Sequence, residues 1–523
     1  MASSPPAPSL DLDARPSRFG IVDLGSNTAR LVVYECRPPH WYRLVDSIRE
    51  PVRLAEGMQD DGSLQPEALE RARAALWLFA DYARAAELDD VHTFATSAVR
   101  EATNRDLLLD QLPKMGLSSF EVLSGEQEAA LGVCAVANAF DLEDAWVMDL
   151  GGGSAQISLM RGGQFVRGTA FPLGAVRLFD RFLAESQEAD GKASRESLER
   201  LDAFLESELA QTLDAVAEDD LPILAMGGTV RNLARIAQKE EDYPLPQLHS
   251  YPLSYESLDR IARKLSGSNQ AERERTGGLS LDRADIIVPG ARVFRHVLER
   301  SGRSELLISG VGVREGAFFR RFLPEPHRIE DVRKFAVGNL FSHYPQPRLH
   351  TEHVRRLAER LFEGLTPLHN LDDSWRELLT AAATLHDIGM TIGYYRHHRH
   401  GAFLVSSSAL HGFDHREHAL ITLLVHYHRK GEPSGRHLSP LLRSGDLRAL
   451  GVLSVCLRMA EHLERSRSAR IDEVGVSIQS DVVRLHLFAA HRPTVEMVET
   501  LKDAPLFEST FERRLEIVYK DIR

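Results

Sequence analysis

Two stretches of the sequence decide the fold: VDLGSNTARL at residues 22–31 and MDLGGGSAQI at residues 148–157. Each places Asp-Leu-Gly and a run of small residues between apolar segments, and the two aspartates, at positions 23 and 149, lie 126 residues apart. This separation is far too long for the repeat of a solenoid protein. It predicts two related units that face each other across a shared site.

Each stretch predicts a strand, a tight turn and a second strand. Glycine lets the backbone approach a ligand closely, so the N–H groups of such a turn can converge on an anionic oxygen, phosphate above all. A single turn of this kind is usually structural. Two copies, together with the turn at Gly227, Gly228 and Thr229 and the glycine-rich segment 310–316, favour a nucleotide- or phosphate-binding cleft.

The rest of the chain divides near residue 325. Before it, strand and helix patterns mix, which is typical of an α/β protein; residues 66–88 predict a helix, and residues 91–99 predict a strand that runs into Arg100. From there to about residue 470 the chain is rich in histidine and predicts helices. Two strand candidates follow, and residues 506–519 fit either a strand or a helix.

Composition excludes several classes of protein. The chain has 523 residues, 43% of them hydrophobic and 27% charged, with a net charge of −13, so it is not a purely electrostatic nucleic-acid binder. Its three cysteines are far apart, which indicates neither a disulfide framework nor a thiolate zinc site and fits a reducing cytoplasm. No membrane span or signal peptide is expected, and residues 1–17 predict a disordered tail.

Six motifs, in order, resemble those of the exopolyphosphatase and guanosine pentaphosphate phosphohydrolase (Ppx/GppA) family. They are VDLGSNTARL, ATSAVREATN, VLSGEQEA, VMDLGGGSAQISL, AMGGTVRNLA and GVGVREGAFF. The resemblance implies two ribonuclease-H-like domains of the actin, sugar-kinase and chaperone ATPase superfamily, at 18–136 and 137–324. The later stretches LHDIGMTIGYYRHHRHGAFLV and LITLLVHYHRK are similar to the helical domain of long family members. That similarity implies an all-α, HD-like domain at 325–470, and we expect a small α+β domain at 471–523.

The resemblance also implies roles for individual residues. Glu128 would be the catalytic base, since it matches the glutamate that family members use; the alternative is a carboxylate that only stabilises the start of a helix. Asp149, assisted by Asp23, would hold Mg²⁺ or Mn²⁺. Arg100 would contact the phosphoryl oxygens, unless it is an ordinary surface arginine. The residues expected to bind phosphate are Ser26, Asn27, Gly151, Gly152, Gly153, Ser154, Gly227, Gly228 and Thr229.

One position departs from the family pattern. The second turn usually reads GGGSTEL and here reads GGGSAQI, so Gln156 stands where a glutamate is expected, and Ala155 removes a hydroxyl. A neutral amide cannot replace a metal-binding charge. The expectation is a weaker Mg²⁺ site, or compensation by Glu126.

The histidine-rich region suggests a second metal site. His353, the pair His386 and Asp387, and Glu461 follow the ligand order of metal-dependent HD phosphohydrolases, except that an aspartate is usual at the last position. The alternative is a non-catalytic remnant whose histidines are structural. Two local clusters of basic residues would line a path for a long polyanion, or would be solvated surface charge. The predicted path consists of Arg396, His397, His398, Arg399, His400, Arg429 and Lys430.

Taken together, the sequence predicts an exopolyphosphatase that uses Mg²⁺ to release orthophosphate from the end of inorganic polyphosphate. The family resemblance leaves open a guanosine pentaphosphate phosphohydrolase, a sensor that binds polyphosphate or guanosine tetraphosphate without turnover, and hydrolysis at the HD centre. It also suggests a homodimer. No membrane or nucleic-acid partner is expected.

Overall fold

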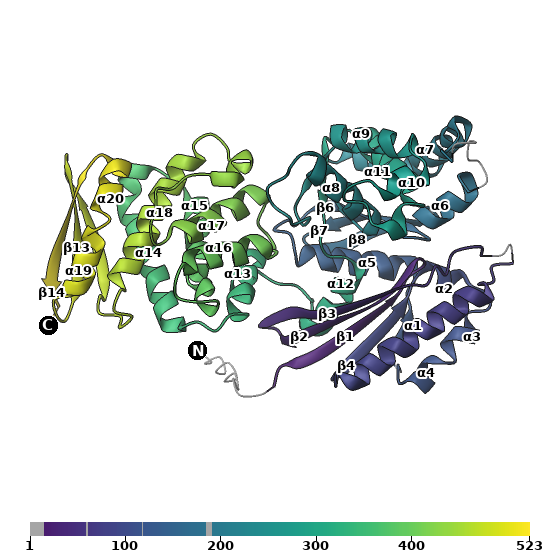
Figure 1. Ribbon diagram of the computed structural model, residues 1–523, viewed down its shortest axis with the longest axis horizontal. Coiled ribbons are helices and arrows are strands. Elements are labelled where there is room, and N and C mark those ends of the chain that lie inside the picture. Colours follow the sequence, from purple (N-terminus) through teal and green to yellow (C-terminus); the bar gives the residue numbers. More distant parts are fainter. Residues whose placement is uncertain (1–14, 59–60, 118, 185–190, 523) are drawn as a thin grey trace, which may run out of the picture.

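The structure, a computed structural model, describes residues 15–58, 61–117, 119–184 and 191–522. Three parts follow one another along the long axis: a pair of α/β lobes, a helical region and a small sheet at the C-terminal end (Figure 1). Residues 1–14 of the predicted tail lie outside the described residues, and the first strand begins at Ser17, inside the segment assigned to that tail.

The first lobe is built on a five-stranded sheet in the order β3-β2-β1-β4-β5. Strands β1 and β2 form the antiparallel hairpin of the first glycine turn, and β4 and β5 continue the sheet in parallel. The strands are β1 (Ser17–Leu24), β2 (Thr28–Arg37), β3 (Trp41–Pro51), β4 (Asp90–Ala95) and β5 (Phe120–Val122). The helices are α1 (Pro66–Ala85), α2 (Ser97–Glu101), α3 (Asp106–Leu109) and α4 (Leu112–Met115).

The second lobe repeats this arrangement with strands in the order β10-β11-β9-β6-β7-β8. Here β6 and β7 form the hairpin of the second glycine turn, and β9 and β11 extend it in parallel. The strands are β6 (Ala145–Leu150), β7 (Ala155–Arg161), β8 (Gln164–Phe171), β9 (Ile223–Met226), β10 (Pro252–Ser254) and β11 (Glu305–Ile308). Its helices include α6 (Ala175–Phe182), α7 (Arg195–Glu218), α8 (Gly228–Glu240), α9 (Tyr255–Ser266), α10 (Gln270–Glu274) and α11 (Ile287–Ser301), with a 3-10 turn η1 (Leu281–Arg283).

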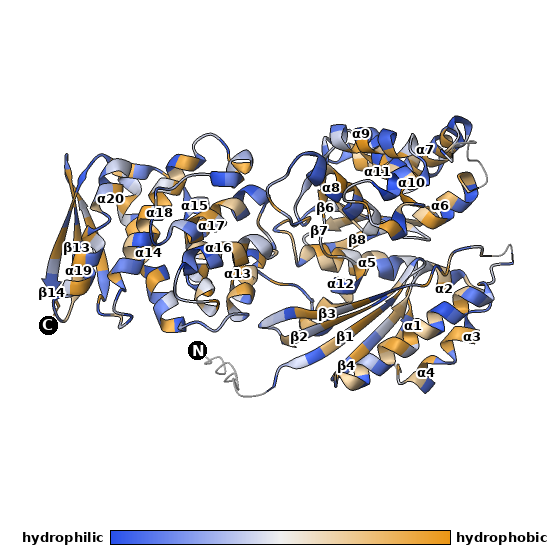
Figure 2. Cartoon of the chain, viewed as in Figure 1, coloured by the Kyte–Doolittle hydropathy of each residue, from blue (hydrophilic) through white to orange (hydrophobic). Residues whose placement is uncertain are grey.

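Alternation along β1 explains how one sheet gains two covered faces. Val22 belongs to the core shared with Phe79 of α1, whereas the preceding Ile21 belongs to the core on the other face. Helix α1 carries both apolar and polar residues, as an amphipathic helix on a sheet should (Figure 2).

Two helices are exchanged between the lobes. Helix α5 (Gly125–Ala137) follows the first sheet in sequence, yet its Val133 and Val136 pack in the core of the second sheet. Helix α12 (Val313–Phe322) follows the second sheet, yet Phe318 and Phe322 pack on β1 and β2. The boundary predicted at 136/137 assigns α5 to the first unit, and the packing differs because each helix crosses to the opposite sheet.

The helical region and the C-terminal sheet share one apolar core, so the boundary predicted at 470/471 does not separate two cores. The helices are α13 (Val332–Ser342), α14 (Arg348–His369), α15 (Asp373–Leu385), α16 (His397–Ser407), α17 (His415–Tyr427) and α18 (Asp446–Leu463), with 3-10 turns η2 (Ile388–Thr391) and η3 (Arg436–Leu441). The C-terminal elements are β12 (Glu473–Ile478), β13 (Val482–Ala489), α19 (Thr494–Leu501), α20 (Ala504–Phe511) and β14 (Arg514–Asp521), with the strands in the order β12-β13-β14.

Polar contacts fix the helical region to both lobes. His415 Nε2 donates to the carbonyl of His249 in the second lobe (2.8 Å), and the Tyr42 N–H of β3 donates to Asn339 Oδ1 of α13 (2.8 Å). Within the described part of the chain, no helix combines the length and the apolar character that crossing a membrane requires.

Candidate active site

The two glycine turns meet in space. In each turn the first glycine N–H closes the hairpin, Gly25 onto the Thr28 carbonyl (3.1 Å) and Gly151 onto the Ser154 carbonyl (2.9 Å). A Cβ on Gly153 would lie 2.7 Å from Ser26 Oγ in the opposite turn. Glycine is therefore required there by close approach of the two hairpins, and the repeated motif forms one site.

A cavity of about 280 Å³ lies between these turns. It receives side chains and backbone from both sheets, from α5, α8 and α12 and from η1. Of the residues predicted to bind phosphate, those that line it are Ser26, Asn27, Gly151, Gly152, Gly153, Ser154, Gly227 and Gly228. Thr229 is outside this lining: it is buried behind Gly228, where Arg283 Nη1 donates to its hydroxyl (3.4 Å).

Three carboxylates face the cavity. Asp23 and Asp149 occupy corresponding positions near the ends of β1 and β6, and Glu128 lies in the first turn of α5. That helix begins with a capping box in which Ser124 Oγ accepts from the Gln127 N–H (3.1 Å) and the Gln127 side chain accepts from the Ser124 N–H (2.7 Å). The cap fixes where α5 starts and thereby places Glu128 at the cavity.

Burial changes the acidity of all three groups. Burial, reinforced by the charge of Asp149, raises the pKa of Glu128 to about 7. Burial also raises the pKa of Asp149 to about 6 and raises the pKa of Asp23 above its ordinary value. A carboxylate with a pKa near neutrality is suited to accept a proton from water at physiological pH.

Arg100 has a different place from the predicted one. It does not line the cavity; its Nη1 donates to the Leu123 carbonyl (2.7 Å) and to Glu128 Oε2 (3.2 Å). Its guanidinium therefore orients the candidate base rather than contacting the cavity directly.

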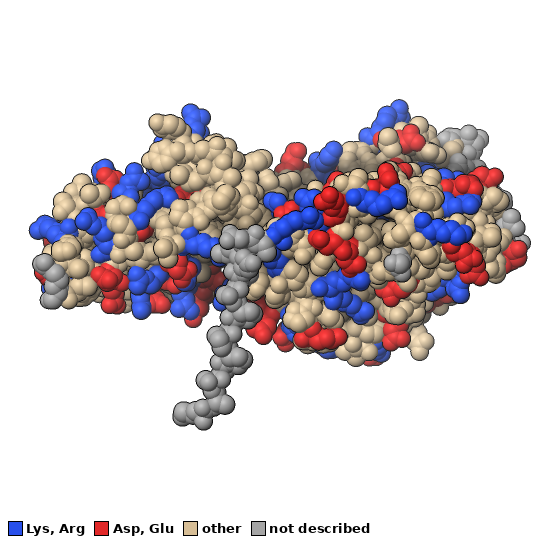
Figure 3. All heavy atoms as spheres, turned by 90° about the horizontal axis from the view of Figure 1, so that it is seen from below, with Lys and Arg blue, Asp and Glu red and all other residues tan. Residues whose placement is uncertain are grey.

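Six arginines that line the cavity were missed in the sequence: Arg30, Arg49, Arg231, Arg235, Arg283 and Arg314. Burial and mutual repulsion lower the pKa of Arg30 and of Arg283 to about 10, which shows how strongly positive charge is crowded here. Six cations against three carboxylates make the cavity attractive to a polyanion. Positive charge is a local property of the cavity, because on the face in Figure 3 basic and acidic side chains are interspersed over the lobes.

The carboxylates also fit a hard divalent cation. Within the described part of the chain Asp149 makes no side-chain hydrogen bond or ion pair, although it is buried beside the glycine turn; a free carboxylate oxygen is the ligand that Mg²⁺ prefers. Asp23 is paired with Arg314 Nη1 (3.1 Å), so it is the less available of the two. Gln156 and Glu126 are absent from the cavity lining: Gln156 is buried and donates to Ser154 Oγ (3.0 Å), and Glu126 is exposed.

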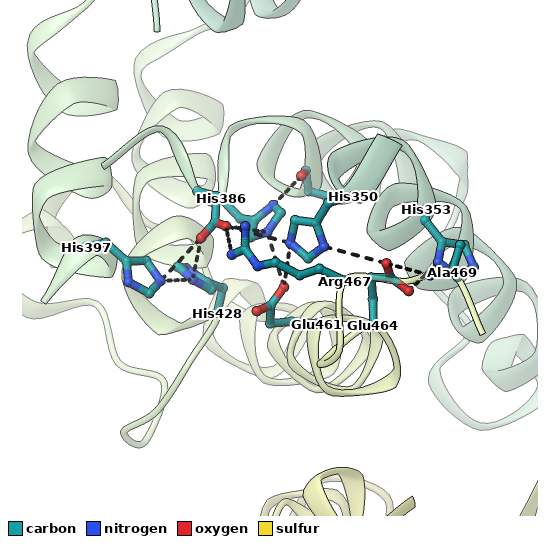
Figure 4. Close-up of polar contacts among 11 residues, drawn as sticks. His350, His353, His386, His397, His428, Glu461, Glu464, Arg467 and Ala469 are labelled. Atoms are coloured by element: carbon teal, nitrogen blue, oxygen red, sulfur yellow. Dashed lines mark hydrogen bonds and ion pairs between the residues drawn. The ribbon is translucent and has the colours of Figure 1, made fainter. Parts of the chain in front are cut away.

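The predicted second metal site is only partly assembled. His386, Asp387 and Glu461 lie together, but His353 points away, with Nδ1 2.5 Å from Glu464 Oε2 and Nε2 donating to the Ile471 carbonyl (2.8 Å) (Figure 4). His350, one helical turn earlier on α14, joins the cluster instead. Helical phase is the reason, since residues three apart on a helix differ enough in direction to face different neighbours.

The predicted polyanion path is also divided. Arg396, His398, Arg429 and Lys430 line one surface hollow of about 410 Å³, and Arg399 lines a neighbouring one with His398 and Lys430. His397 is buried in the histidine cluster and is not part of this surface. His400 lines neither hollow.

Comparison with known proteins places these features in a family. A sequence profile of the Ppx/GppA phosphatase family matches residues 32–325, and a profile of Ppx/GppA phosphatase domain III matches residues 332–512. A guanosine-5'-triphosphate,3'-diphosphate pyrophosphatase from Vibrio vulnificus is 25% identical over 479 residues, 90% of this chain and 92% of that protein. The crystal structure of an exopolyphosphatase from Cytophaga hutchinsonii, 25% identical, superposes with a TM-score of 0.54 over 58% of this chain and 98% of that one.

Proposed function

The chain belongs to the Ppx/GppA phosphatase family and is a phosphoanhydride hydrolase, and from this premise we propose that it is an exopolyphosphatase. Enzymes of this family generally depend on a divalent metal ion. The proposed reaction removes orthophosphate from the end of an inorganic polyphosphate chain. The observation that carries the proposal is the cavity in which six arginines and two glycine turns surround three carboxylates.

In the proposed arrangement the terminal phosphoryl group lies between the two turns. Backbone N–H groups of Gly151, Gly152 and Gly153 and the hydroxyl of Ser154 would bind its oxygens from one side, with Ser26 and Asn27 opposite. The arginines would neutralise the charge that spreads over the phosphoryl oxygens and the leaving chain. Mg²⁺ held by Asp149, with Asp23 nearby, would supply further positive charge to these oxygens.

Glu128 is the proposed general base. Its carboxylate accepts a proton from water as the water oxygen attacks the terminal phosphorus, and the bridging P–O bond to the next phosphate breaks. The electron pair of that bond leaves with the shortened chain, and orthophosphate is the other product. Arg100 is a positioning residue that holds Glu128 in its ionised form.

A second candidate, hydrolysis of guanosine pentaphosphate to the tetraphosphate, is supported by the relative from Vibrio vulnificus, which matches 90% of this chain. Both substrates end in a phosphoanhydride, so the same cavity serves either reaction. Preference between them depends on what lies behind the second phosphate, whether more phosphate or a nucleoside.

The deciding experiment measures orthophosphate release, with Mg²⁺, from long-chain polyphosphate and from guanosine pentaphosphate. Glu128→Gln should abolish release from the preferred substrate, whereas Glu126→Gln, on the exposed side of the same helical turn, should retain it. Faster turnover of the nucleotide would replace the first proposal by the second. Binding without turnover of either substrate would identify a sensor, and full activity of Glu128→Gln would move the chemistry away from this cavity.

For the helical region we propose an HD-like domain, and for the whole protein a homodimer. The first proposal is supported by the gathering of His386, Asp387 and Glu461, and the second by the family resemblance. Sedimentation of the full chain tests the oligomeric state.

A further inference from the structure

Six buried side chains of the helical region converge on one point (Figure 4). They are His350 of α14, His386 and Asp387 at the end of α15, His397 of α16, His428 after α17 and Glu461 of α18. None is more than 6% exposed. Because five elements contribute them and none lies at the surface, they form a built site rather than a patch of solvated charge.

Three of the histidines have a fixed orientation. The Nδ1–H groups of His386, His397 and His428 donate to the carbonyls of Ala383 (2.7 Å), Tyr394 (2.9 Å) and Val425 (2.7 Å). A carbonyl can only accept, so Nδ1 carries the proton and, in a neutral ring, Nε2 presents a lone pair. This backbone anchoring is the arrangement typical of metal-ligating histidines.

The converging atoms lack hydrogen-bond partners of their own. Within the described residues, His350 Nε2, His386 Nε2, Asp387 Oδ1 and Glu461 Oε2 are buried without a hydrogen bond. Nε2 of His397 and Nε2 of His428 are 3.1 Å apart, so two lone pairs point at each other when both rings are neutral. Such a set of acceptors requires positive charge between its members.

The acceptors form two groups, one on each oxygen of Asp387. On the side of Oδ2 lie His350 Nε2 (3.6 Å) and His386 Nε2 (3.8 Å), and Glu461 Oε2 is 3.3 Å from both nitrogens. On the side of Oδ1 lie His397 Nε2 (3.3 Å) and His428 Nε2 (3.9 Å). Ligands at about 2.1 Å from one ion stand roughly 3.0–3.5 Å apart, which is close to these separations.

We propose that this cluster binds two divalent transition-metal ions bridged by Asp387. One ion is held by His350, His386, Glu461 and Asp387 Oδ2, and the other by His397, His428 and Asp387 Oδ1. Four protein ligands complete a tetrahedral shell for the first ion, whereas three leave the second with room for water or a substrate oxygen.

The ligand chemistry separates this centre from the cavity between the lobes. Four imidazole nitrogens favour Mn²⁺, Fe²⁺ or Zn²⁺ over Mg²⁺, whereas the cavity offers carboxylates. His397, expected on the polyanion path, and His350, not expected at all, are both ligands in this assignment. Arg467 Nη2 donates to Asp387 Oδ2 (2.5 Å) and supplies part of the positive charge that the first ion would bring, so the two compete for this oxygen.

The test counts Mn²⁺ bound to the full chain after dialysis. It uses an Asp149→Asn background, so that an ion in the cavity does not add to the count and failure of the proposed hydrolase function has no effect on the result. We expect two Mn²⁺ per chain and an exchange-coupled electron paramagnetic resonance signal, which only bridged ions produce. The double variant His397→Ala/His428→Ala should retain one ion and an uncoupled spectrum, and His437→Ala, which removes an exposed histidine of the same region, should retain two.

One ion or none in the unsubstituted cluster, or two ions with an uncoupled spectrum, would overturn the proposal. So would two ions retained by His397→Ala/His428→Ala. If that variant does not fold by circular dichroism, His428→Gln replaces it, and the spectrum of the unsubstituted cluster decides the question without any ligand substitution.

Discussion

Arg100 Nη1 lies 3.2 Å from Glu128 Oε2, although the two residues stand on elements that pack in different lobes. Arg100 is on α2, beside the first sheet, and Glu128 is on α5, which is buried against the second sheet. The ion pair therefore joins the lobes at the residue proposed to activate water. It also opposes burial, because Arg100 lowers the pKa of Glu128 while burial and Asp149 raise it.

Removing this cation should move the pH dependence of activity. The base works when ionised, and the pKa of Glu128 is about 7, so kcat/KM should rise through that range with increasing pH. In Arg100→Gln the pKa of Glu128 should be higher, because its nearest positive charge is gone. The acid limb of the profile of kcat/KM against pH should then shift to higher pH, while Arg84→Gln, at an exposed site on α1, leaves it in place. An unchanged limb would show that another group titrates.

Gly153→Ala should inactivate the enzyme. The added Cβ would lie 2.7 Å from Ser26 Oγ and still closer to Ser97 Oγ, so the two turns would have to move apart. Because displacement of a binding group by about 1 Å commonly costs on the order of 100-fold, we expect a loss of that size in kcat/KM. Gly338→Ala, in α13 with open space around its Cβ, is the control. Activity of Gly153→Ala within a fewfold of the parent would mean that contact between the turns is not needed.

Gln156→Glu tests the departure from the family pattern. Gln156 pairs with Asp149 in the register of β6 and β7, so a carboxylate there adds negative charge beside the proposed metal ligand. We expect a lower Mg²⁺ concentration for half-maximal activity, together with a loss of about 1–3 kcal/mol in the free energy of unfolding, since the new charge is buried beside Ser154. Gln164→Glu, exposed on β8, should change neither quantity. A folded variant with an unaltered Mg²⁺ requirement would contradict the assignment of Asp149.

The surface hollow should matter for long substrates alone. Arg396→Gln/Lys430→Gln removes two exposed cations from its lining, and we expect KM to rise for long-chain polyphosphate but not for tripolyphosphate. Arg360→Gln/Arg376→Gln removes the same charge from residues paired with Glu363 elsewhere in the helical region and serves as the control. Equal effects of both double variants on long chains would reduce the path to general electrostatics.

Local patterns carried most of what could be predicted from the sequence. The hairpins around Gly25 and Gly151 were predicted from apolar runs and small residues, and the Ppx/GppA resemblance and the α/β fold with a helical region after it are confirmed. The strand expected at 91–99 is only partly right: β4 ends at Ala95, and Ser97–Glu101 is helical. Strand β3 was missed because it lies at the sheet edge and is mostly exposed, so it lacks the apolar alternation that marks a strand.

The site was harder to predict where distant segments meet. Arg231 and Arg314 closely follow glycine turns in the quoted motifs, so asking which cation comes after each turn would have found them. Arg49 and Arg283 lie on elements far from any motif, and spacing gives no signal for them. The choice of His353 over His350 failed for a related reason, since only the packing of α14 decides which of two histidines one turn apart faces the other ligands.

The exchanged helices α5 and α12 give the cavity a spine. Each is covalently attached to one lobe and packed on the other, and Gly316 of α12 rests against the Leu131 carbonyl of α5 so closely that no Cβ would fit. Rotation of the lobes about this seam, like covers about a binding, would spread the glycine turns while the seam itself hardly moves. A methyl group at Gly316 would therefore act on the timing of opening and product escape from a place that no substrate touches.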